Sequence, residues 1–254
     1  MDLLSKIRRS ILDFLFPIEC LACGRAKHYL CQDCLMKLNF LGRQSCLFCN
    51  RTSPAGQSCP DCQKHHALDG AFIAGNYQDP LLAELIKKFK FSGLKSLAEP
   101  LGAFLVAALS HNEGDWPEFL EKVIPRAIRH NPLKNFLASQ PLLIPIPISA
   151  KRRAYRGYNQ SELIASALLK DMPGLNYSDA LKKIRHTPAQ SSLQASRRFD
   201  NLEASFVWKG KSLTGLGVLL LDDIATTGTT LEEAAKTLKR AGALKVWGLA
   251  LAKG

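Results

Sequence analysis

Long hydrophobic runs are absent from this chain of 254 residues. Its longest apolar stretch, Leu101–Leu109, is far shorter than the roughly 20 residues that a membrane-spanning helix requires. An export signal is also missing, because Lys6, Arg8 and Arg9 stand where an uninterrupted apolar segment would lie. With 46% hydrophobic and 22% charged residues, the chain has enough apolar side chains for a sizeable core. These features predict a globular protein of the reducing cytoplasm, without a transmembrane segment.

Cysteine is absent after residue 62, although the chain contains eight cysteines. This asymmetry predicts two unequal domains, with residues 1–68 forming a small cysteine-rich unit and residues 69–254 a larger one. A disulfide framework requires an oxidising compartment, which the missing export signal argues against. The cysteines are therefore expected to act as thiolate ligands.

The cysteines form four C-x-x-C pairs, and two such pairs complete one tetrahedral shell around Zn²⁺. The pairs are Cys20/Cys23, Cys31/Cys34, Cys46/Cys49 and Cys59/Cys62. The short gaps between them predict one structural zinc on the first two pairs and a second on the last two, although interleaved pairing also fits the spacing. A redox dithiol is the alternative, but one pair would suffice for it and no thioredoxin-like pattern surrounds these pairs. Four thiolates leave no ligand position for a substrate, so both sites are expected to stabilise the fold.

Outside the cysteine pairs, the chain has a helical pattern near its start and alternating strands and helices after residue 69. Residues 3–15 have an apolar stripe beside basic residues, which predicts a helix that packs on the body of the protein or, alternatively, docks on a membrane or partner. From residue 69 strands alternate with helices, which is typical of an α/β fold with a mostly parallel sheet in three layers. The expected strands are 71–77, 142–147, 179–185, 204–208, 217–222 and 246–251, and the expected helices are 80–91, 97–110, 116–138, 158–170 and 229–241.

The most informative segment is Gly217–Gly242, where an apolar strand ends in two acids and a small hydroxylic loop precedes a helix. Backbone amides at a helix N-terminus bind phosphate, Gly228 permits close approach, and the threonine hydroxyls add donors. Asp222 and Asp223 cannot serve the same anion, but they can accept hydrogen bonds from ribose hydroxyls. The segment therefore favours a sugar phosphate, with an ordinary strand, turn and capped helix as the alternative. A Walker A loop is excluded because its lysine is absent.

The segment Val218–Thr230, VLLLDDIATTGTT, resembles the phosphoribosyl pyrophosphate (PRPP) motif of type I phosphoribosyltransferases. Three further features narrow the resemblance to the ComF/GntX family of competence-associated proteins: the four cysteine pairs, Pro145–Gln160 (PIPISAKRRAYRGYNQ) and Thr187–Asn201 (TPAQSSLQASRRFDN). Tyr158 and Ser192 are mild departures, standing where Phe and Gly are common. The resemblance covers nearly the whole chain and implies a Rossmann-like type I phosphoribosyltransferase domain after a double zinc ribbon.

The resemblance also implies the site residues. PRPP would be bound by Asp222, Asp223, Ala225, Thr226, Thr227, Gly228, Thr229 and Thr230, with Ser149, Ala150, Lys151 and Arg152 forming a loop on the pyrophosphate side. Residues 186–203 would form a lid over the site, and Arg197 in the lid and Asp223 are the candidates for a catalytic role. Mg²⁺ would arrive with the pyrophosphate.

Basic charge is concentrated in residues 151–198, which contain ten Lys and Arg but only three acidic residues. Tyr155 and Tyr158 lie among the arginines, a pattern that favours single-stranded DNA, with a solvated face and a core contact as the alternatives. By resemblance the protein would handle incoming single-stranded DNA during natural transformation, beside helicase-like and recombination partners that could hold it at the membrane. An active phosphoribosyltransferase with an unknown acceptor and a PRPP-sensing regulator are the two other readings.

Overall fold

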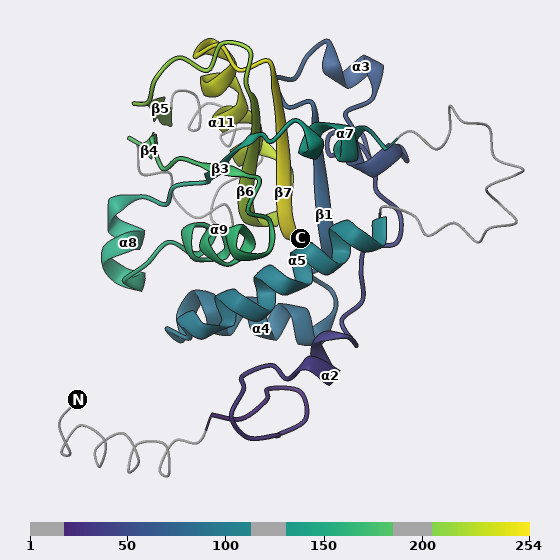
Figure 1. Cartoon of the computed structure of the whole chain (residues 1–254), viewed down its shortest axis with the longest axis vertical. Helices are drawn as coiled ribbons and strands as arrows, with labels where there is room; N and C mark the ends of the chain where they lie inside the picture. The colour runs from purple at the N-terminus through teal and green to yellow at the C-terminus, as the bar shows by residue number, and fades with distance from the viewer. Residues whose placement is uncertain (1–17, 113–130, 185–204) are drawn as a thin grey trace, which may run out of the picture.

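The larger part of the molecule is built on a parallel β-sheet (Figure 1). The structure is a computed structural model and describes residues 18–112, 131–184 and 205–254. The strand order is β1-β7-β6-β2-β3, and every neighbouring pair is parallel. The strands are β1 (Gly70–Asn76), β2 (Leu142–Pro145), β3 (Asn176–Tyr177), β6 (Gly217–Ala225) and β7 (Lys245–Lys253). The predicted α/β class with a mostly parallel sheet is thus confirmed.

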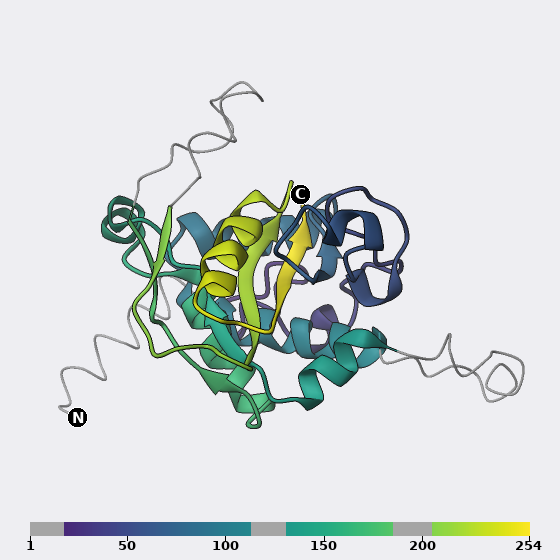
Figure 2. The same ribbon diagram turned by 90° about the horizontal axis from the view of Figure 1, so that it is seen from above.

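Helices cover both faces of the sheet, as the view in Figure 2 shows. One face packs against α4 (Pro80–Phe91), α5 (Ala98–Asn112), α7 (Pro132–Ala138) and α9 (Gln160–Asp171), with a 3-10 turn at Lys95–Leu97. The other face packs against α11 (Thr229–Arg240) and a two-stranded antiparallel hairpin of β4 (Leu181–Lys183) and β5 (Phe206–Trp208). The result is a three-layered sandwich in which β6 is buried at the centre of the sheet.

Helix α4 illustrates how local sequence positions a residue of the site. Asp79 caps the helix by accepting a hydrogen bond from the backbone N–H of Leu82 at 3.0 Å, and Pro80 fits the first helical turn. The apolar face of the helix is buried, and it includes Leu85 and Phe89. The helix therefore lies firmly on the sheet and presents Lys90 at its last turn.

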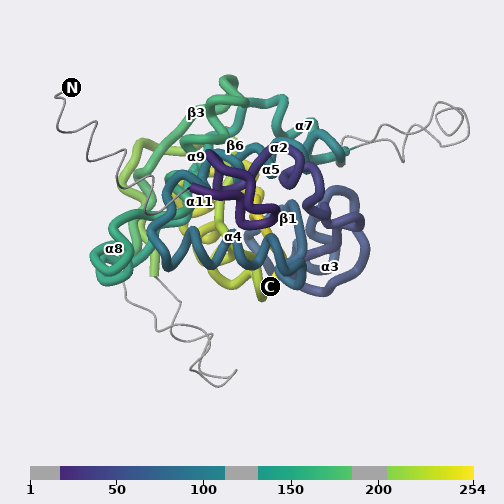
Figure 3. Tube along the Cα trace, turned by 90° about the horizontal axis from the view of Figure 1, so that it is seen from below, coloured from purple at the N-terminus to yellow at the C-terminus, as the bar shows by residue number. Residues whose placement is uncertain are grey.

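The two cysteine-rich units pack on different parts of this body (Figures 1 and 3). The first, residues 18–38 with α2 (Gln32–Leu35), packs against the core that contains α5 and α9. The second, residues 44–64, contains a 3-10 turn at Pro54–Gly56 and α3 (Pro60–Gln63).

Two residues of the second unit cover the free edge of β1. Gln44 makes hydrogen bonds to both the N–H and the carbonyl of Ile73, and Gln57 forms a bridge with Gly70. Because an exposed strand edge invites aggregation, this covering protects the sheet as well as fixing the second unit in place.

Several expectations from the sequence differ from the observed elements. Helix α8 (Ala150–Arg156) begins where a loop was expected, and the short strand β3 was not expected at all. Only α7 is observed within the helical stretch expected at 116–138, because residues 116–130 fall outside the described residues. The helix expected at residues 3–15 and the whole lid expected at residues 186–203, including Arg197, also fall outside them. Among the described helices, none has the length and apolar character needed to cross a membrane.

Candidate functional site

The candidate site lies where β6 ends beside β2. Residues Val218–Leu221 of β6 are buried, and the next two residues, Asp222 and Asp223, are only partly buried. Pro145 at the end of β2 pairs with Leu221, and the N–H of Ile146 donates to the carbonyl of Leu221 at 2.8 Å. The acids and the segment after β2 therefore meet at the carboxyl edge of the sheet, where ligands bind in open α/β folds.

The two acids have different surroundings. Asp223 forms an ion pair with Lys90, whose Nζ lies 2.8 Å from Oδ1, and the two side chains are 13% and 15% exposed, respectively. Asp222 accepts a hydrogen bond from the backbone N–H of Asp223 at 2.8 Å. Burial and the negative charge of Asp223 raise the pKa of Asp222 from 3.8 to about 7, against the opposing effect of Lys90 and Lys183. The site therefore combines one firmly paired carboxylate with one that is costly to ionise.

The loop after the acids leads directly into α11. Gly228 is the N-cap residue of α11 in the left-handed conformation, with φ of 76°, and it has no side chain to cap the first turn. Thr226 and Thr227 are exposed, and the hydroxyls of Thr227 and Thr229 lie 2.7 Å apart. The loop therefore combines exposed small hydroxyls with the positive end of a helix dipole, which suits an anion.

The residues expected on the pyrophosphate side lie at the start of a helix and not in a loop. Ser149 caps α8 and accepts a hydrogen bond from the N–H of Arg152 at 3.4 Å, while Ala150 and Lys151 form the first turn. Ser149 is buried, whereas Lys151 is exposed and has no ion-pair partner among the described residues. Ser149 explains why this segment is helical, because its side chain satisfies the N–H of Arg152 in the first turn of α8.

Three cations near the acids were not expected from the sequence. Lys90 reaches Asp223 from the end of α4. Lys183 in β4 is partly buried, and its pKa is lowered by burial and by Arg152, while Asp222 acts in the opposite direction. Arg156 at the end of α8 has its pKa lowered by burial, with Asp223 opposing. A basic last turn in α4 is the only local signal for Lys90, and the helix dipole alone explains such a pattern.

The structure decides between the two readings of the tyrosines near α8. Tyr158 is 6% exposed, stacks at a tilt on Phe89 and donates its hydroxyl hydrogen to the carbonyl of Phe89. It is a core residue, so the reading of Tyr158 as a base-stacking residue is wrong. Tyr155 is 83% exposed and stays available to a ligand.

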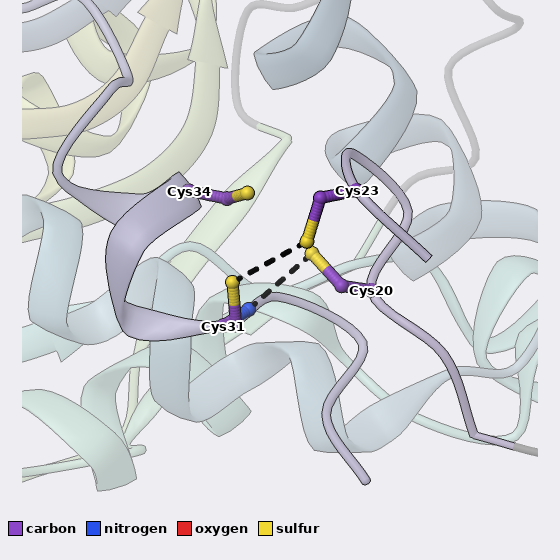
Figure 4. A group of neighbouring side chains, drawn as sticks. All are labelled: Cys20, Cys23, Cys31 and Cys34. Atoms are coloured by element: carbon purple, nitrogen blue, oxygen red, sulfur yellow. Dashed lines mark hydrogen bonds between the residues drawn. The ribbon is translucent and has the colours of Figure 1, made fainter. Parts of the chain in front are cut away.

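The eight cysteines form two separate clusters, each from two consecutive pairs. In each cluster all four sulfur atoms lie within 4.8 Å of one another, and Figure 4 shows how those of the first cluster converge. The Sγ atoms of Cys23 and Cys31 are 3.7 Å apart, and those of Cys49 and Cys59 are 3.6 Å apart. A tetrahedral shell with Zn–S bonds of about 2.3 Å has sulfur atoms about 3.8 Å apart, so both clusters fit Zn²⁺. The adjacent pairing is observed, and the interleaved pairing is excluded.

The surroundings of the clusters also fit a metal. Burial alone would raise the pKa of Cys20 and of Cys46, but hydrogen bonds from the backbone and neighbouring thiols lower both values to about 6. In the same clusters a hydrogen bond with Cys31 raises the pKa of Cys34, and burial raises the pKa of Cys62. Each cluster also has an arginine that bridges its two knuckles, through the ion pairs Arg25–Asp33 at 2.6 Å and Arg51–Asp61 at 2.9 Å. The two ion pairs occupy equivalent positions, so the two units share the same local arrangement. Zn²⁺ in these clusters would replace a hydrophobic core that each unit is too small to form.

Comparisons with known proteins agree with this architecture. Residues 11–63 match the Double zinc ribbon domain family, and residues 156–252 match the Phosphoribosyl transferase domain family. The chain is 30% identical over 252 residues to Competence protein F of Haemophilus influenzae, covering 93% of this chain and 98% of that protein. It is 30% identical over 220 residues to Competence protein ComFC of Bacillus subtilis, covering 84% and 79%. It is 27% identical over 238 residues to DNA utilization protein YhgH of Escherichia coli K12, covering 87% and 96%.

The order of the domains and the extent of these matches agree with the expectation from the motifs. Two four-cysteine clusters precede a parallel sheet. The central strand of this sheet, β6, carries the acidic pair and is followed by the glycine-capped helix α11. The relative from Haemophilus influenzae matches across almost its full length. The chain therefore belongs to the ComF/GntX family, in which a double zinc ribbon precedes a phosphoribosyltransferase domain.

Proposed function

We propose that this protein binds PRPP at the carboxyl end of β6 and handles single-stranded DNA in natural transformation. The observation that carries the PRPP site is the placement of Asp222 and Asp223 at the open edge of a parallel sheet, directly before the glycine-capped start of α11. Ligands of such sheets bind beyond the carboxyl ends of the strands. The match of residues 156–252 to a phosphoribosyltransferase domain supports the same site.

The two halves of the site suit the two chemical groups of a ribose phosphate. Ionised carboxylates only accept hydrogen bonds, so Asp222 and Asp223 would bind the vicinal ribose hydroxyls. The loop would bind the terminal phosphate through its backbone N–H groups and threonine hydroxyls. The proposed contacts are Asp222, Asp223, Ala225, Thr226, Thr227, Gly228, Thr229 and Thr230.

The pyrophosphate would lie between α8 and the hairpin, where cations surround the acids. Lys151 and Arg152 would provide positive charge from the start of α8, with Ser149 and Ala150 beside them. Lys183 adds a cation from β4 that was not part of the sequence expectation. Mg²⁺ would be carried by the pyrophosphate and would neutralise part of its charge. Asp223 and Arg197 stay the candidates for a catalytic role.

The DNA half of the proposal rests on the exposed face of α8 and on the relatives. Lys151 and Tyr155 both lie on this face, and an exposed aromatic side chain next to cations suits the bases and phosphates of a single strand. Two of the relatives are named competence proteins and a third a DNA utilization protein. The division at residues 68 and 69, the cytoplasmic location and helicase-like or recombination partners belong to the same proposal.

The PRPP site is tested by calorimetric titration of the zinc-loaded protein with PRPP and Mg²⁺. We expect saturable binding that weakens by about tenfold or more in the variant that combines Asp222→Asn with Asp223→Asn, because two charged acceptors are lost. Asp171→Asn, an exposed acid at the end of α9, is the matched control and should leave the affinity unchanged. Equal binding by the double variant and the wild type would contradict the proposal.

The DNA surface is tested by fluorescence anisotropy with oligo-dT at about 50 and 200 mM salt. Tyr155→Ala should weaken binding by about fivefold or more, because a stacked base contributes about 1–3 kcal/mol. Lys170→Ala removes an exposed cation of α9 that already pairs with Glu99, so it should have little effect. Binding that does not weaken with salt would contradict a phosphate-contact mechanism. A preference for one defined duplex would favour the regulator, and pyrophosphate release with a nitrogen acceptor would favour the enzyme.

A further inference from the structure

The first knuckle of the second zinc ribbon contacts the phosphate-binding loop. Leu47, which lies between Cys46 and Cys49, is 6% exposed and belongs to the core under α11. A Cβ atom built on Gly228 would lie 2.5 Å from Cδ2 of Leu47 and 3.7 Å from Cε1 of Phe48. The tip of the knuckle therefore packs against the glycine that begins α11.

Further contacts hold the knuckle in this position. The ring of Phe48 stacks on that of His66, with centroids 3.5 Å apart and planes 3° from parallel. Nδ1 of His66 lies 3.7 Å from Oε1 of Glu232, which lies in the first turn of α11. Glu232 is 6% exposed and accepts hydrogen bonds from the N–H groups of Ala67 at 2.9 Å and Leu68 at 3.1 Å.

A second contact joins the knuckle to the end of the sheet. Nζ of Lys253 in β7 donates to Oδ1 of Asn50 at 2.6 Å, and β7 is the neighbour of β6. The knuckle thus contacts the loop after β6, the first turn of α11 and the last residue of β7. The loop and the start of α11 are the elements that would bind the phosphate, and β7 supports them from the neighbouring strand position.

The first ribbon offers a natural comparison, because Leu21 occupies the position between Cys20 and Cys23 that Leu47 occupies between Cys46 and Cys49. Leu21 packs on the hydrophobic core of the opposite face of the sheet, with α5 and α9. A groove of about 320 Å³ between the first ribbon and these helices is lined by Leu30, Leu35 and Ala103, among others. The equivalent leucines of the two ribbons therefore contact different parts of the molecule: Leu21 the core with α5 and α9, and Leu47 the glycine that begins α11.

We infer that the second zinc ribbon is part of the phosphate-binding site, with its metal holding Leu47 and Phe48 against Gly228 and so fixing the loop Thr226–Thr230. This role rests on the proposed binding of PRPP by that loop. A knuckle this small has no core of its own, so four thiolates and a metal fix the position of the leucine between them. Leu47 is then a positioning residue for phosphate binding, and Leu21 stabilises the fold only.

The first experiment compares Leu47→Ala with Leu21→Ala. PRPP affinity is measured by calorimetry, and zinc content is measured on the same samples. We expect Leu47→Ala to keep both zinc ions and to weaken PRPP binding by about tenfold, and Leu21→Ala to change the affinity by less than about twofold. Leu47→Met, which fills a similar volume, should restore most of the affinity. Equal affinities in the two alanine variants would overturn the inference.

The second experiment removes one metal at a time and does not depend on PRPP. Cys49→Ser and Cys23→Ser change equivalent, exposed cysteines of the second and first clusters. Hydrogen exchange of a peptide that spans residues 224–233 should become faster in Cys49→Ser and stay unchanged in Cys23→Ser. Faster exchange in both variants, or in neither, would overturn the inference. Absence of PRPP binding by the wild type would instead refute the proposed function, while this exchange experiment would still test the contact.

Discussion

Replacing Asp222 by asparagine should stabilise the protein without ligand while it disables the proposed site. Burial and the neighbouring charge of Asp223 raise the pKa of Asp222 from 3.8 to about 7. A raised pKa means that the folded state binds the proton more tightly than the unfolded chain does. The stability from this group is therefore fully present below about pH 4 and is lost as the pH rises towards 7. Asparagine keeps the acceptor for the N–H of Asp223 and removes the charge.

The magnitude follows from the size of the shift. A shift of about three units corresponds to at most about 4 kcal/mol, because one pKa unit is worth about 1.36 kcal/mol. Asp222 is only partly buried, so we expect a smaller value, about 1–3 kcal/mol, above about pH 7.5. The difference in the free energy of unfolding between Asp222→Asn and the wild type should be close to zero near pH 4 and should increase up to about pH 7.

The assay is urea unfolding of both proteins between about pH 5.5 and 8.5 in a zinc-buffered solution. Acid also weakens the binding of zinc to thiolates, but this effect is common to both proteins and cancels in the difference. Asp223→Asn is the control. It leaves Lys90 without its partner at 2.8 Å, so it should destabilise the protein at neutral pH. A difference for Asp222→Asn that is independent of pH, or a loss of stability at about pH 8, would refute the reasoning.

Three further changes have defined outcomes. Gly228→Ala should lower the free energy of unfolding by about 1–3 kcal/mol in urea titrations, because φ is 76° and the new Cβ would lie 2.5 Å from Leu47; an unchanged midpoint would contradict the close packing of Leu47 on Gly228. Glu232→Ala should cost about 2–4 kcal/mol in the same assay, since the N–H groups of Ala67 and Leu68 lose their acceptor, and Glu232→Gln should cost less. Chelation of the purified protein should release two zinc ions per chain and lower the melting temperature, whereas one ion per chain would refute the two-site assignment.

Local patterns predicted most of the regular structure. Asp79 and Pro80 mark the start of α4, and the expected range 80–91 is the observed one. The apolar run before Asp222 predicted the central strand, although β6 continues to Ala225 because it still pairs with Lys253 of β7 beyond the acids. The C-x-x-C spacing predicted two metal clusters because each tight turn brings its two thiols together.

Long-range contacts could not be predicted in this way. The ion pair of Lys90 with Asp223 and the packing of Leu47 on Gly228 join segments that are far apart in the chain. Tyr158 lies in a basic sequence, yet its ring is buried because α4 passes beside it and offers the carbonyl of Phe89. Such features depend on which elements the fold brings together, so the sequence alone left the role of Tyr158 open.

The central claim is that the acidic pair and the glycine-capped loop together bind PRPP. The most direct measurement is an experimental structure of the zinc-loaded protein with PRPP and Mg²⁺. We expect the ribose hydroxyls to lie within hydrogen-bond distance of Asp222 and Asp223, and the terminal phosphate to lie on the backbone N–H groups of Thr226–Thr230. A ligand that binds elsewhere, or a loop that remains empty at saturating PRPP, would contradict the claim.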